Sequence, residues 1–252
     1  MTAKSSVEHD FRVALVTGAS RGLGQAVCHA LARNGYCVIG VSRTFEPTSG
    51  SFPIPKRRCK RGTLLRFHCD VRSGADTRAL VSWVDANLGR LDVLVNNAGV
   101  GTFIPVGETS DKQWETILST NLTGAFLCTR ESIPLLEKSG GGLIVNVASI
   151  AAIRGLPNLA AYSASKAGLV GLGQALAAEL RPRNIHVCNV LAGAIATEFW
   201  NSAGLAAHWS REDMMSAERV AELLSHVIGL YPDVVVEQLV LMPARGLIQD
   251  VG

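Results

Sequence analysis

The sequence lacks a long apolar run, which limits where the protein resides. The apolar stretch nearest its beginning, Val13 to Val16, is far too short for a signal-peptide core or a membrane span. We therefore expect a cytoplasmic protein with no membrane partner. Residues 1–10 are polar, and we expect a flexible tail there.

The six cysteines lack the spacing of a metal site, because they include no C-x-x-C pair and do not cluster with histidines. A disulfide framework is improbable for a cytosolic chain of this size. We expect no metal and reduced thiols, most of them in the core. The cysteines are Cys28, Cys37, Cys59, Cys69, Cys128 and Cys188.

Charge and aromatic residues are also scarce, at 18% and 6% of the chain, with a net charge of only +3. This balance is too mild to indicate nucleic acid or an anionic membrane as a partner. Thr44 to Gly62 is an exception, because it combines three prolines with five Lys or Arg residues between Lys56 and Arg61. We expect a long basic loop at 44–62. Either a solvated insertion or a phosphate-binding loop fits it, whereas a nucleic-acid contact would need interleaved aromatics that are missing.

The apolar content of 48% is sufficient for a large core, and short β-branched runs alternate with segments of helical period. This alternation is typical of βαβ units around a parallel sheet. We predict one α/β domain over residues 1–252, a doubly wound Rossmann fold with about seven parallel strands flanked by helices. The predicted strands are Val13 to Thr17, Cys37 to Ser42, Leu64 to Cys69, Val93 to Asn96, Leu143 to Val147, His186 to Val190 and Gln238 to Met242. The predicted helices are Gly24 to Asn34, Asp76 to Leu88, Asp111 to Leu136, Ala160 to Arg181 and Ala217 to Ile228.

A glycine-rich turn joins the first predicted strand to the first predicted helix. Its sequence is Thr17-Gly18-Ala19-Ser20-Arg21-Gly22-Leu23-Gly24. Glycine tolerates positive φ and lets backbone N–H groups approach a pyrophosphate at the positive end of a helix. The spacing is G-x-x-x-G-x-G and not the common G-x-G-x-x-G. A purely structural turn is the alternative, but the flanking strand and helix favour dinucleotide binding.

The residues after the second predicted strand indicate which dinucleotide is bound. An acid at this place would hold the ribose 2′-hydroxyl of NAD, whereas a base accepts the 2′-phosphate of NADP. The chain has Ser42 and Arg43 there, and Arg21 in the glycine turn adds a second cation suited to phosphate. We therefore predict that NADP(H) is preferred over NAD(H), although Arg43 as a plain surface arginine stays possible.

Tyr162 and Lys166 are four residues apart at the head of a predicted helix, so they share one face. A nearby ammonium favours the phenolate, which allows a tyrosine to exchange protons near neutral pH. Ser149 follows a predicted strand and would lie at the carboxyl edge of the sheet, where it can orient a carbonyl. Each residue alone has an ordinary structural explanation; only the combination is specific.

Together these motifs resemble the short-chain dehydrogenase/reductase family over nearly the whole chain, and are most similar to reductases of the 3-oxoacyl-carrier-protein type. The motifs that carry the resemblance are T-G-A-S-R-G-L-G, Asn96-Asn97-Ala98-Gly99, Asn121, Ser149 and Tyr162-Ser163-Ala164-Ser165-Lys166.

The resemblance implies roles for individual residues. Asn121, Ser149, Tyr162 and Lys166 would be catalytic, with Asn121 holding a water in a proton relay that reaches Lys166. Its amide would equally serve as a buried cap of neighbouring backbone. Asp70 would contact adenine. The cofactor-binding residues that we expect are Gly18, Ser20, Arg21, Gly22, Leu23, Gly24, Ser42, Arg43, Asp70, Val71, Asn97, Ala98, Gly99, Tyr162, Lys166, Ile195 and Thr197.

The chain departs from this family pattern in two places. Ala192-Gly193 stands where relatives commonly carry Pro-Gly, so we expect a looser loop and weaker cofactor binding. The segment Leu241 to Ile248 lacks the D-G-G ending of many 3-oxoacyl reductases. The resemblance implies a homodimer or homotetramer built on the long helices near Asp111 and Ala160.

We therefore predict an enzyme that transfers a hydride between NADP(H) and a small carbonyl or secondary-alcohol substrate, a ketone or a 3-oxoacyl thioester. A catalytically silent NADPH-binding regulator is the alternative, although a sensor has no need of a proton relay. The substrate site should be mainly apolar. The residues expected to wall it are Thr102, Phe103, Ile153, Arg154, Leu156 and Phe199 to Trp209.

Overall fold

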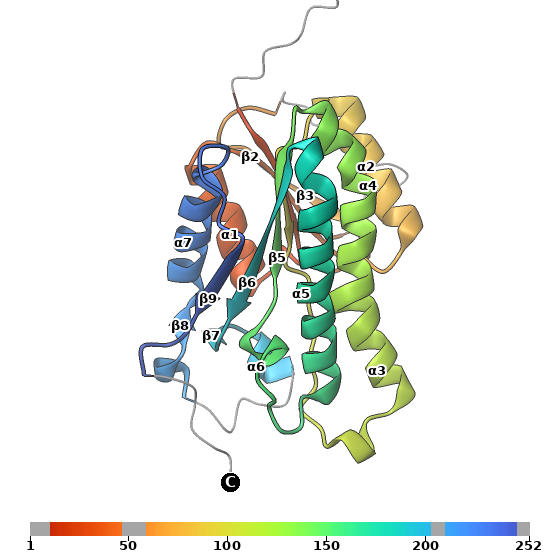
Figure 1. Ribbon diagram of the computed structural model, residues 1–252, viewed down its shortest axis with the longest axis vertical. Coiled ribbons are helices and arrows are strands. Elements are labelled where there is room, and N and C mark those ends of the chain that lie inside the picture. Colours follow the sequence, from red (N-terminus) through yellow and green to blue (C-terminus); the bar gives the residue numbers. More distant parts are fainter. Residues whose placement is uncertain (1–10, 47–58, 203–209, 246–252) are drawn as a thin grey trace, which may run out of the picture.

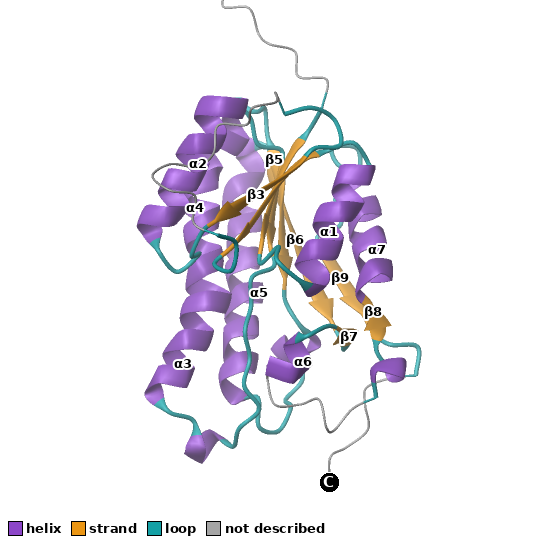
Figure 2. Ribbon diagram, turned by 180° about the vertical axis from the view of Figure 1, so that it is seen from behind, coloured by secondary structure: helices purple, strands orange, loops and turns teal. Residues whose placement is uncertain are grey.

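The computed structural model describes residues 11–46, 59–202 and 210–245, and its centre is a seven-stranded parallel sheet (Figures 1 and 2). The strand order is β3-β2-β1-β4-β5-β6-β9, so the direction of winding reverses between β1 and β4. In open α/β sheets, ligands bind outside the carboxyl ends of the strands at such a reversal. The strands are β1 (Val13–Thr17), β2 (Cys37–Ser42), β3 (Leu64–His68), β4 (Val93–Asn96), β5 (Gly142–Val147), β6 (Ile185–Ala192) and β9 (Gln238–Leu241).

Helices cover both faces of this sheet. One face is covered by α1 (Gly22–Arg33) and α7 (Ala217–Gly229), and the other by α2 (Gly74–Leu88), α4 (Gly124–Lys138) and α5 (Ala160–Leu180) (Figure 1). Because both faces are buried, the central strands are almost continuously apolar. The predicted α/β doubly wound fold is confirmed, and each of the seven predicted strands is present with ends shifted by at most two residues.

The prediction of one α-helix from Asp111 to Leu136 is wrong in one respect, because a π-helical turn interrupts the α-helix. A π-helical turn, Ser119–Thr123, separates α3 (Asp111–Leu118) from α4. A π turn holds one residue more than an α-helical turn, so it rotates the side chains that follow but does not end the helix. The apolar spacing of the sequence therefore does not reveal it. Asn121 lies in this turn.

The prediction that all six cysteines are reduced is also wrong, since the structure joins Cys37 to Cys59 by a disulfide. Their Cα atoms are 6.2 Å apart, within the usual range for a disulfide. Cys37 begins β2, and the next residue, Val38, pairs with Leu64 at the start of the parallel strand β3. Cys59 comes five residues before Leu64 and lies beside the start of β2. The other four cysteines are free and buried.

Three short elements lie beyond the carboxyl ends of the strands and were not predicted. They are β7 (Ile195–Ala196), α6 (Phe199–Ser202) and β8 (Met215–Ser216), and β7 pairs with β8. Elements this short carry no periodic signal. The tail 1–10, most of the basic loop (47–58) and the C-terminal segment from 246 lie outside the described residues. In the described part of the chain, every helix is too short or too polar to cross a membrane.

Candidate active site

The glycine turn between β1 and α1 forms a cradle in which side chains have no room. Gly18 and Gly22 have positive φ angles of 67° and 54°, which other residues rarely adopt. A Cβ on Gly24 would clash with the Gly18 carbonyl and the Asn97 amide. Helix α1 begins at Gly22 without a side-chain cap and with no acidic residue in its first turn. Its first N–H groups are therefore suited to a phosphate, and this part of the site fits a dinucleotide.

The segment after β4 fixes the back of this turn. Asn97 Nδ2 donates to the carbonyl oxygens of Thr17 (2.8 Å) and Gly18 (3.2 Å). The backbone N–H groups of Asn97 and Ala98 both donate to the Thr17 hydroxyl at 3.0 Å. These four bonds couple the ends of β1 and β4 where the sheet reverses.

The residues expected to discriminate between NADP and NAD, and to contact adenine, lie at the ends of β2 and β3. Ser42 Oγ donates to Ser20 Oγ at 3.0 Å, and Arg43 lines the same pocket. Asp70 lies outside that pocket lining and instead makes a bidentate bond to Arg72, with N–O distances of 3.0 and 2.6 Å. Hydrogen bonds from Arg72 lower the pKa of Asp70. The expected contact between Asp70 and adenine would therefore compete with this ion pair.

Ser149, Tyr162 and Lys166 converge at the carboxyl edge of the sheet. Ser149 follows β5, while Tyr162 and Lys166 lie in the first two turns of α5. Lys166 Nζ donates to the Val147 carbonyl at 2.7 Å and lies 5.7 Å from the centroid of the Tyr162 ring. The three side chains thus share one pocket.

Burial changes the acid–base properties of two of these groups. Desolvation raises the pKa of Tyr162 to about 12, and a hydrogen bond to Ser149 acts in the opposite direction. Desolvation also lowers the pKa of Lys166 to about 8, since the residue is only 4% exposed. A bound positive charge near the phenol would further favour the phenolate.

Asn121 uses its side chain to hold the backbone after β4. Its Nδ2 donates to the Val100 carbonyl and to Ser165 Oγ, both at 2.9 Å, and its Oδ1 accepts from the Val100 N–H at 2.8 Å. The amide is therefore fully engaged with neighbouring backbone and with α5. This arrangement corresponds to the structural interpretation of Asn121, which is compatible with a relay through its own backbone carbonyl.

A cavity of about 310 Å³ joins the glycine turn to the Ser149–Tyr162–Lys166 group. All the residues expected at the site line it except Asp70 and Asn121. Of the expected substrate wall, Leu156, Phe199 and Trp200 line it, whereas Thr102, Phe103, Ile153 and Arg154 do not. Residues 203–209 of that wall lie outside the described residues.

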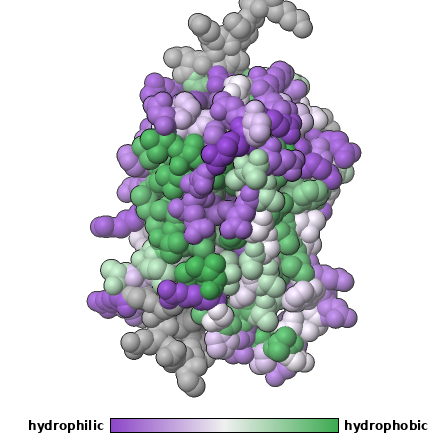
Figure 3. Space-filling model, viewed as in Figure 1, coloured by the Kyte–Doolittle hydropathy of each residue, from purple (hydrophilic) through white to green (hydrophobic). Residues whose placement is uncertain are grey.

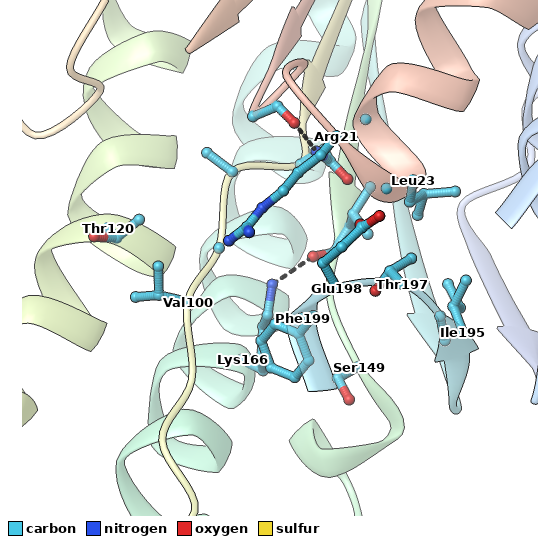
Figure 4. Close-up of a pocket in the computed structure, with 18 of the residues that line it drawn as sticks. Arg21, Leu23, Val100, Thr120, Ser149, Lys166, Ile195, Thr197, Glu198 and Phe199 are labelled. Carbon is cyan, nitrogen blue, oxygen red and sulfur yellow. Dashed lines mark hydrogen bonds between the residues drawn. The ribbon is translucent and has the colours of Figure 1, made fainter. Parts of the chain in front are cut away.

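Several lining residues were not predicted from the sequence, among them Thr120 and Glu198 (Figure 4). Thr120 is 5% exposed, and its buried hydroxyl has no hydrogen-bond partner within residues 11–46, 59–202 and 210–245. A Cβ on Gly22 would lie 3.7 Å from Glu198 Oε2, so this carboxylate stands beside the glycine turn. No motif indicates either residue, because only the π turn and the loop after β7 bring them to the cavity.

Among the described residues, no group of three or more His, Cys, Asp or Glu side chains is arranged to hold a metal ion. The charged groups around the cavity are instead the buried Lys166, the exposed Arg21 and Arg43 and the carboxylate of Glu198, and the other polar groups are hydroxyls and amides. They suit an organic ligand with phosphates at one end.

Two curated proteins illustrate what this chain is similar to. D-threitol dehydrogenase of Mycolicibacterium smegmatis is 38% identical over 202 residues, which cover 79% of this chain and 77% of that protein. A 3-oxoacyl-[acyl-carrier-protein] reductase of Synechocystis is 36% identical over 187 residues, covering 74% of this chain and 75% of the relative.

Solved structures share the fold. A short-chain dehydrogenase from Streptomyces avermitilis is 26% identical with a TM-score of 0.76, over 93% of this chain and 89% of that one. An alcohol dehydrogenase from Thermococcus sibiricus, complexed with 5-hydroxy-NADP, superimposes with a TM-score of 0.81 at 24% identity, over 96% of this chain and all of its own. The family model described as short chain dehydrogenase matches residues 12–207. The chain therefore belongs to the short-chain dehydrogenase family of oxidoreductases, which bind a nicotinamide cofactor.

Proposed function

We propose that the chain is an NADP(H)-dependent oxidoreductase acting on a ketone, a 3-oxoacyl thioester or the corresponding secondary alcohol, with Tyr162 as the general acid and base. The observation that carries this proposal is the convergence of Ser149, Tyr162 and Lys166 at one end of a cavity whose other end is the glycine turn. A relative is named as a 3-oxoacyl reductase, and others as dehydrogenases of threitol and cyclopentanol.

Each of the three side chains has a separate task in this proposal. The nicotinamide supplies and accepts the hydride when it is bound. Ser149 Oγ orients the substrate oxygen, and Tyr162 donates its proton to that oxygen in reduction and removes it in oxidation. Lys166, held by the Val147 carbonyl, places its charge beside the phenol and lowers the cost of forming the phenolate. A backbone carbonyl of the π turn at Asn121 would hold the water that returns the proton.

The preference for NADP(H) rests on the end of β2. Arg43 lines the pocket with Ser42 and Ser20, and no carboxylate stands at the end of β2. A guanidinium at this position gives bidentate hydrogen bonds to a 2′-phosphate. Arg21 lines the same cavity and supplies a second cation (Figure 4).

The substrate end of the cavity is apolar. Phe199 packs against Tyr162 with ring centroids 5.5 Å apart, and Leu156 and Ile150 also line this end. Such a wall favours a hydrophobic carbonyl compound over a charged one.

We also propose that the chain forms a homodimer through its long helices. Trp114 of α3 and Phe126 of α4 are 42% and 43% exposed, and a pale, weakly apolar stripe follows α5 in Figure 3. The exposed residues of α5 include Ala164, Ala167 and Ala175, whose small side chains allow a second helix to approach closely.

The test is NADPH oxidation at 340 nm with a panel of diketones, cyclic ketones, aldehydes and 3-oxoacyl thioesters, with wild type, Tyr162→Phe and an NADH series. We expect turnover that prefers NADPH, and a loss of about a hundredfold or more in kcat for Tyr162→Phe, because proton transfer is removed while ring packing is kept. The Kd for NADPH should stay within about threefold.

Equal turnover by wild type and Tyr162→Phe would contradict the assigned role of Tyr162. NADPH binding without turnover of any compound in the panel would instead favour the silent regulator.

A further inference from the structure

Three buried asparagines form a row across the middle of the sheet. Asn96, Asn146 and Asn189 lie on the adjacent strands β4, β5 and β6 in matching register, and none is more than 4% exposed. Asn96 Nδ2 donates to Asn146 Oδ1 at 3.0 Å, and Asn146 Nδ2 donates to Asn189 Oδ1 at 3.1 Å. Amides are costly to bury in an apolar core, and their bonds are directional, so the row fixes these strands relative to one another.

Helix α5 rests directly on this row at Gly173. A Cβ on Gly173 would clash with Asn189 Oδ1, and would lie 2.7 Å from Asn189 Nδ2 and 2.8 Å from Asn146 Nδ2. No side chain fits between the helix backbone and the two amides. The row therefore limits how closely α5 approaches the sheet.

The helix that rests on this row carries the proposed catalytic pair. Gly173 lies seven residues, or two turns, after Lys166, and both face the sheet. Asn146 immediately precedes Val147, whose carbonyl accepts the hydrogen bond from Lys166 Nζ. One short stretch of β5 thus supports α5 at Gly173 and binds it at Lys166.

We propose that Asn146 and Asn189 are positioning residues, on which Gly173 rests so that α5 holds Tyr162 and Lys166 at the correct height above Ser149. This proposal rests on the proposed function of Tyr162 and Lys166. It predicts that filling the contact at Gly173 displaces the pair, and that a displacement of about 1 Å costs tenfold to a hundredfold in rate.

Gly171 on the same helix provides a matched control. It is exposed, and a Cβ added there meets nothing within 4 Å. Gly173→Ala and Gly171→Ala make the same chemical change and the same gain in helix propensity. Gly171 shares its exposed helix face with Ala164, Ala167 and Ala175, which are proposed above to pair with a second copy, so sedimentation velocity compares the masses of both variants. Between variants of equal mass, any difference comes from the contact with the asparagine row.

The experiment compares Gly173→Ala, Gly171→Ala, Asn189→Ala and the double variant Gly173→Ala/Asn189→Ala. Titrations measure the Kd for NADPH and for its fragment adenosine 2′,5′-bisphosphate. If the protein prefers NADH, then NADH replaces NADPH and adenosine 5′-diphosphate replaces the bisphosphate. Turnover is measured with the best substrate across a pH series, together with Tyr162→Phe.

Gly173→Ala should weaken NADPH binding about tenfold, because Lys166, which lines the cavity as an expected cofactor-binding residue, is displaced. Binding of the adenosine fragment should change less than about twofold, since the glycine turn and β2 do not contact α5 at this position. Its kcat should fall tenfold or more with a displaced pH profile, while Gly171→Ala stays within twofold of wild type. The double variant should recover most of the loss, because removing the Asn189 amide makes room for the new methyl group.

Identical binding and pH profiles for the two glycine variants, or equal losses for NADPH and the fragment, would overturn the proposal. If Gly173→Ala yields no folded protein, the double variant must be folded and bind NADPH, and its failure counts against the proposal. Unchanged turnover in Tyr162→Phe would reject the proposed function instead, which separates the two failures.

Discussion

Lys166 brings a primary amine into a largely buried position, with the residue only 4% exposed. Its contacts are the Val147 carbonyl and the Tyr162 ring, and no carboxylate forms a salt bridge with it among the described residues. Desolvation therefore lowers its pKa from 10.5 to about 8. A buried ammonium without a paired carboxylate costs stability, which fits the catalytic role proposed for Lys166.

That cost predicts how stability depends on pH. Below pH 8 the folded chain keeps a buried charge that the unfolded chain solvates, and between pH 8 and 10.5 the unfolded chain binds more protons than the folded one. The free energy of unfolding should therefore rise with pH in this window. From pH 7.5 to 9.5, wild type should gain about 1–2 kcal/mol relative to Lys166→Met. The raised pKa of Tyr162 acts above pH 10 and in the opposite direction.

Urea unfolding of both proteins without cofactor at several pH values measures this difference. The two chains share every other titrating group, so the difference isolates Lys166. A constant difference would show that the lysine keeps its usual pKa, and a falling one that folding raises this pKa; either result would contradict the prediction.

Arg43 gives a second prediction at this scale. Arg43→Asp removes the guanidinium and introduces an acid that suits the ribose 2′-hydroxyl of NADH. The ratio of kcat/KM for NADPH to that for NADH should fall by about tenfold to a hundredfold, since hydrogen bonds to charged groups are worth about 1.5–3 kcal/mol. Steady-state kinetics with both cofactors tests it, and a ratio that does not change would remove Arg43 from the site.

At the scale of elements, the site is built from the segments that follow the strands, and contacts to their backbone hold these segments together. The glycine turn needs the close approach of Gly24 to Gly18, and Asn97 binds both Thr17 and Gly18 from the neighbouring strand. The π turn places Asn121 where its side-chain amide donates a hydrogen bond to the Val100 carbonyl. These contacts leave the start of α1 open toward the cavity.

Gly24→Ala should separate the glycine turn from Asn97 and weaken NADPH binding by about tenfold or more, because the N–H groups no longer point at one phosphate position. Gly229→Ala at the end of α7 is the control, since a Cβ there meets nothing within 4 Å. Fluorescence titration with NADPH gives both Kd values. Equal NADPH affinity in the two variants would show that the glycine turn does not need the close approach of Gly24 to bind the cofactor.

At the scale of the whole molecule, some large apolar side chains on the helices that cover the sheet stay exposed on the surface. Phe126 is 43% exposed on α4, with the Arg130 guanidinium 5.3 Å from its ring centroid. Large apolar side chains in such a position are typical of a surface that pairs with another copy.

Phe126→Glu should therefore shift the protein toward monomer, because it places like charges opposite each other in a two-fold interface. Sedimentation velocity over a range of concentrations measures the mass, with Leu223→Glu on α7, 40% exposed, as the control. A wild-type protein that is already monomeric would reject the proposed dimer.

The sequence by itself determined the fold class, the seven strands and the residues of the Ser149–Tyr162–Lys166 group. These follow from local period and short spacings, since a glycine turn and an i, i+4 pair keep their geometry wherever they occur. The tertiary structure alone decided that Cys37 meets Cys59 and that Thr120 and Glu198 reach the cavity. It also placed Gly173 on the asparagine row. Such contacts depend on how far β2, β4, β5 and β6 lie from one another in space, and no spacing along the chain records that distance.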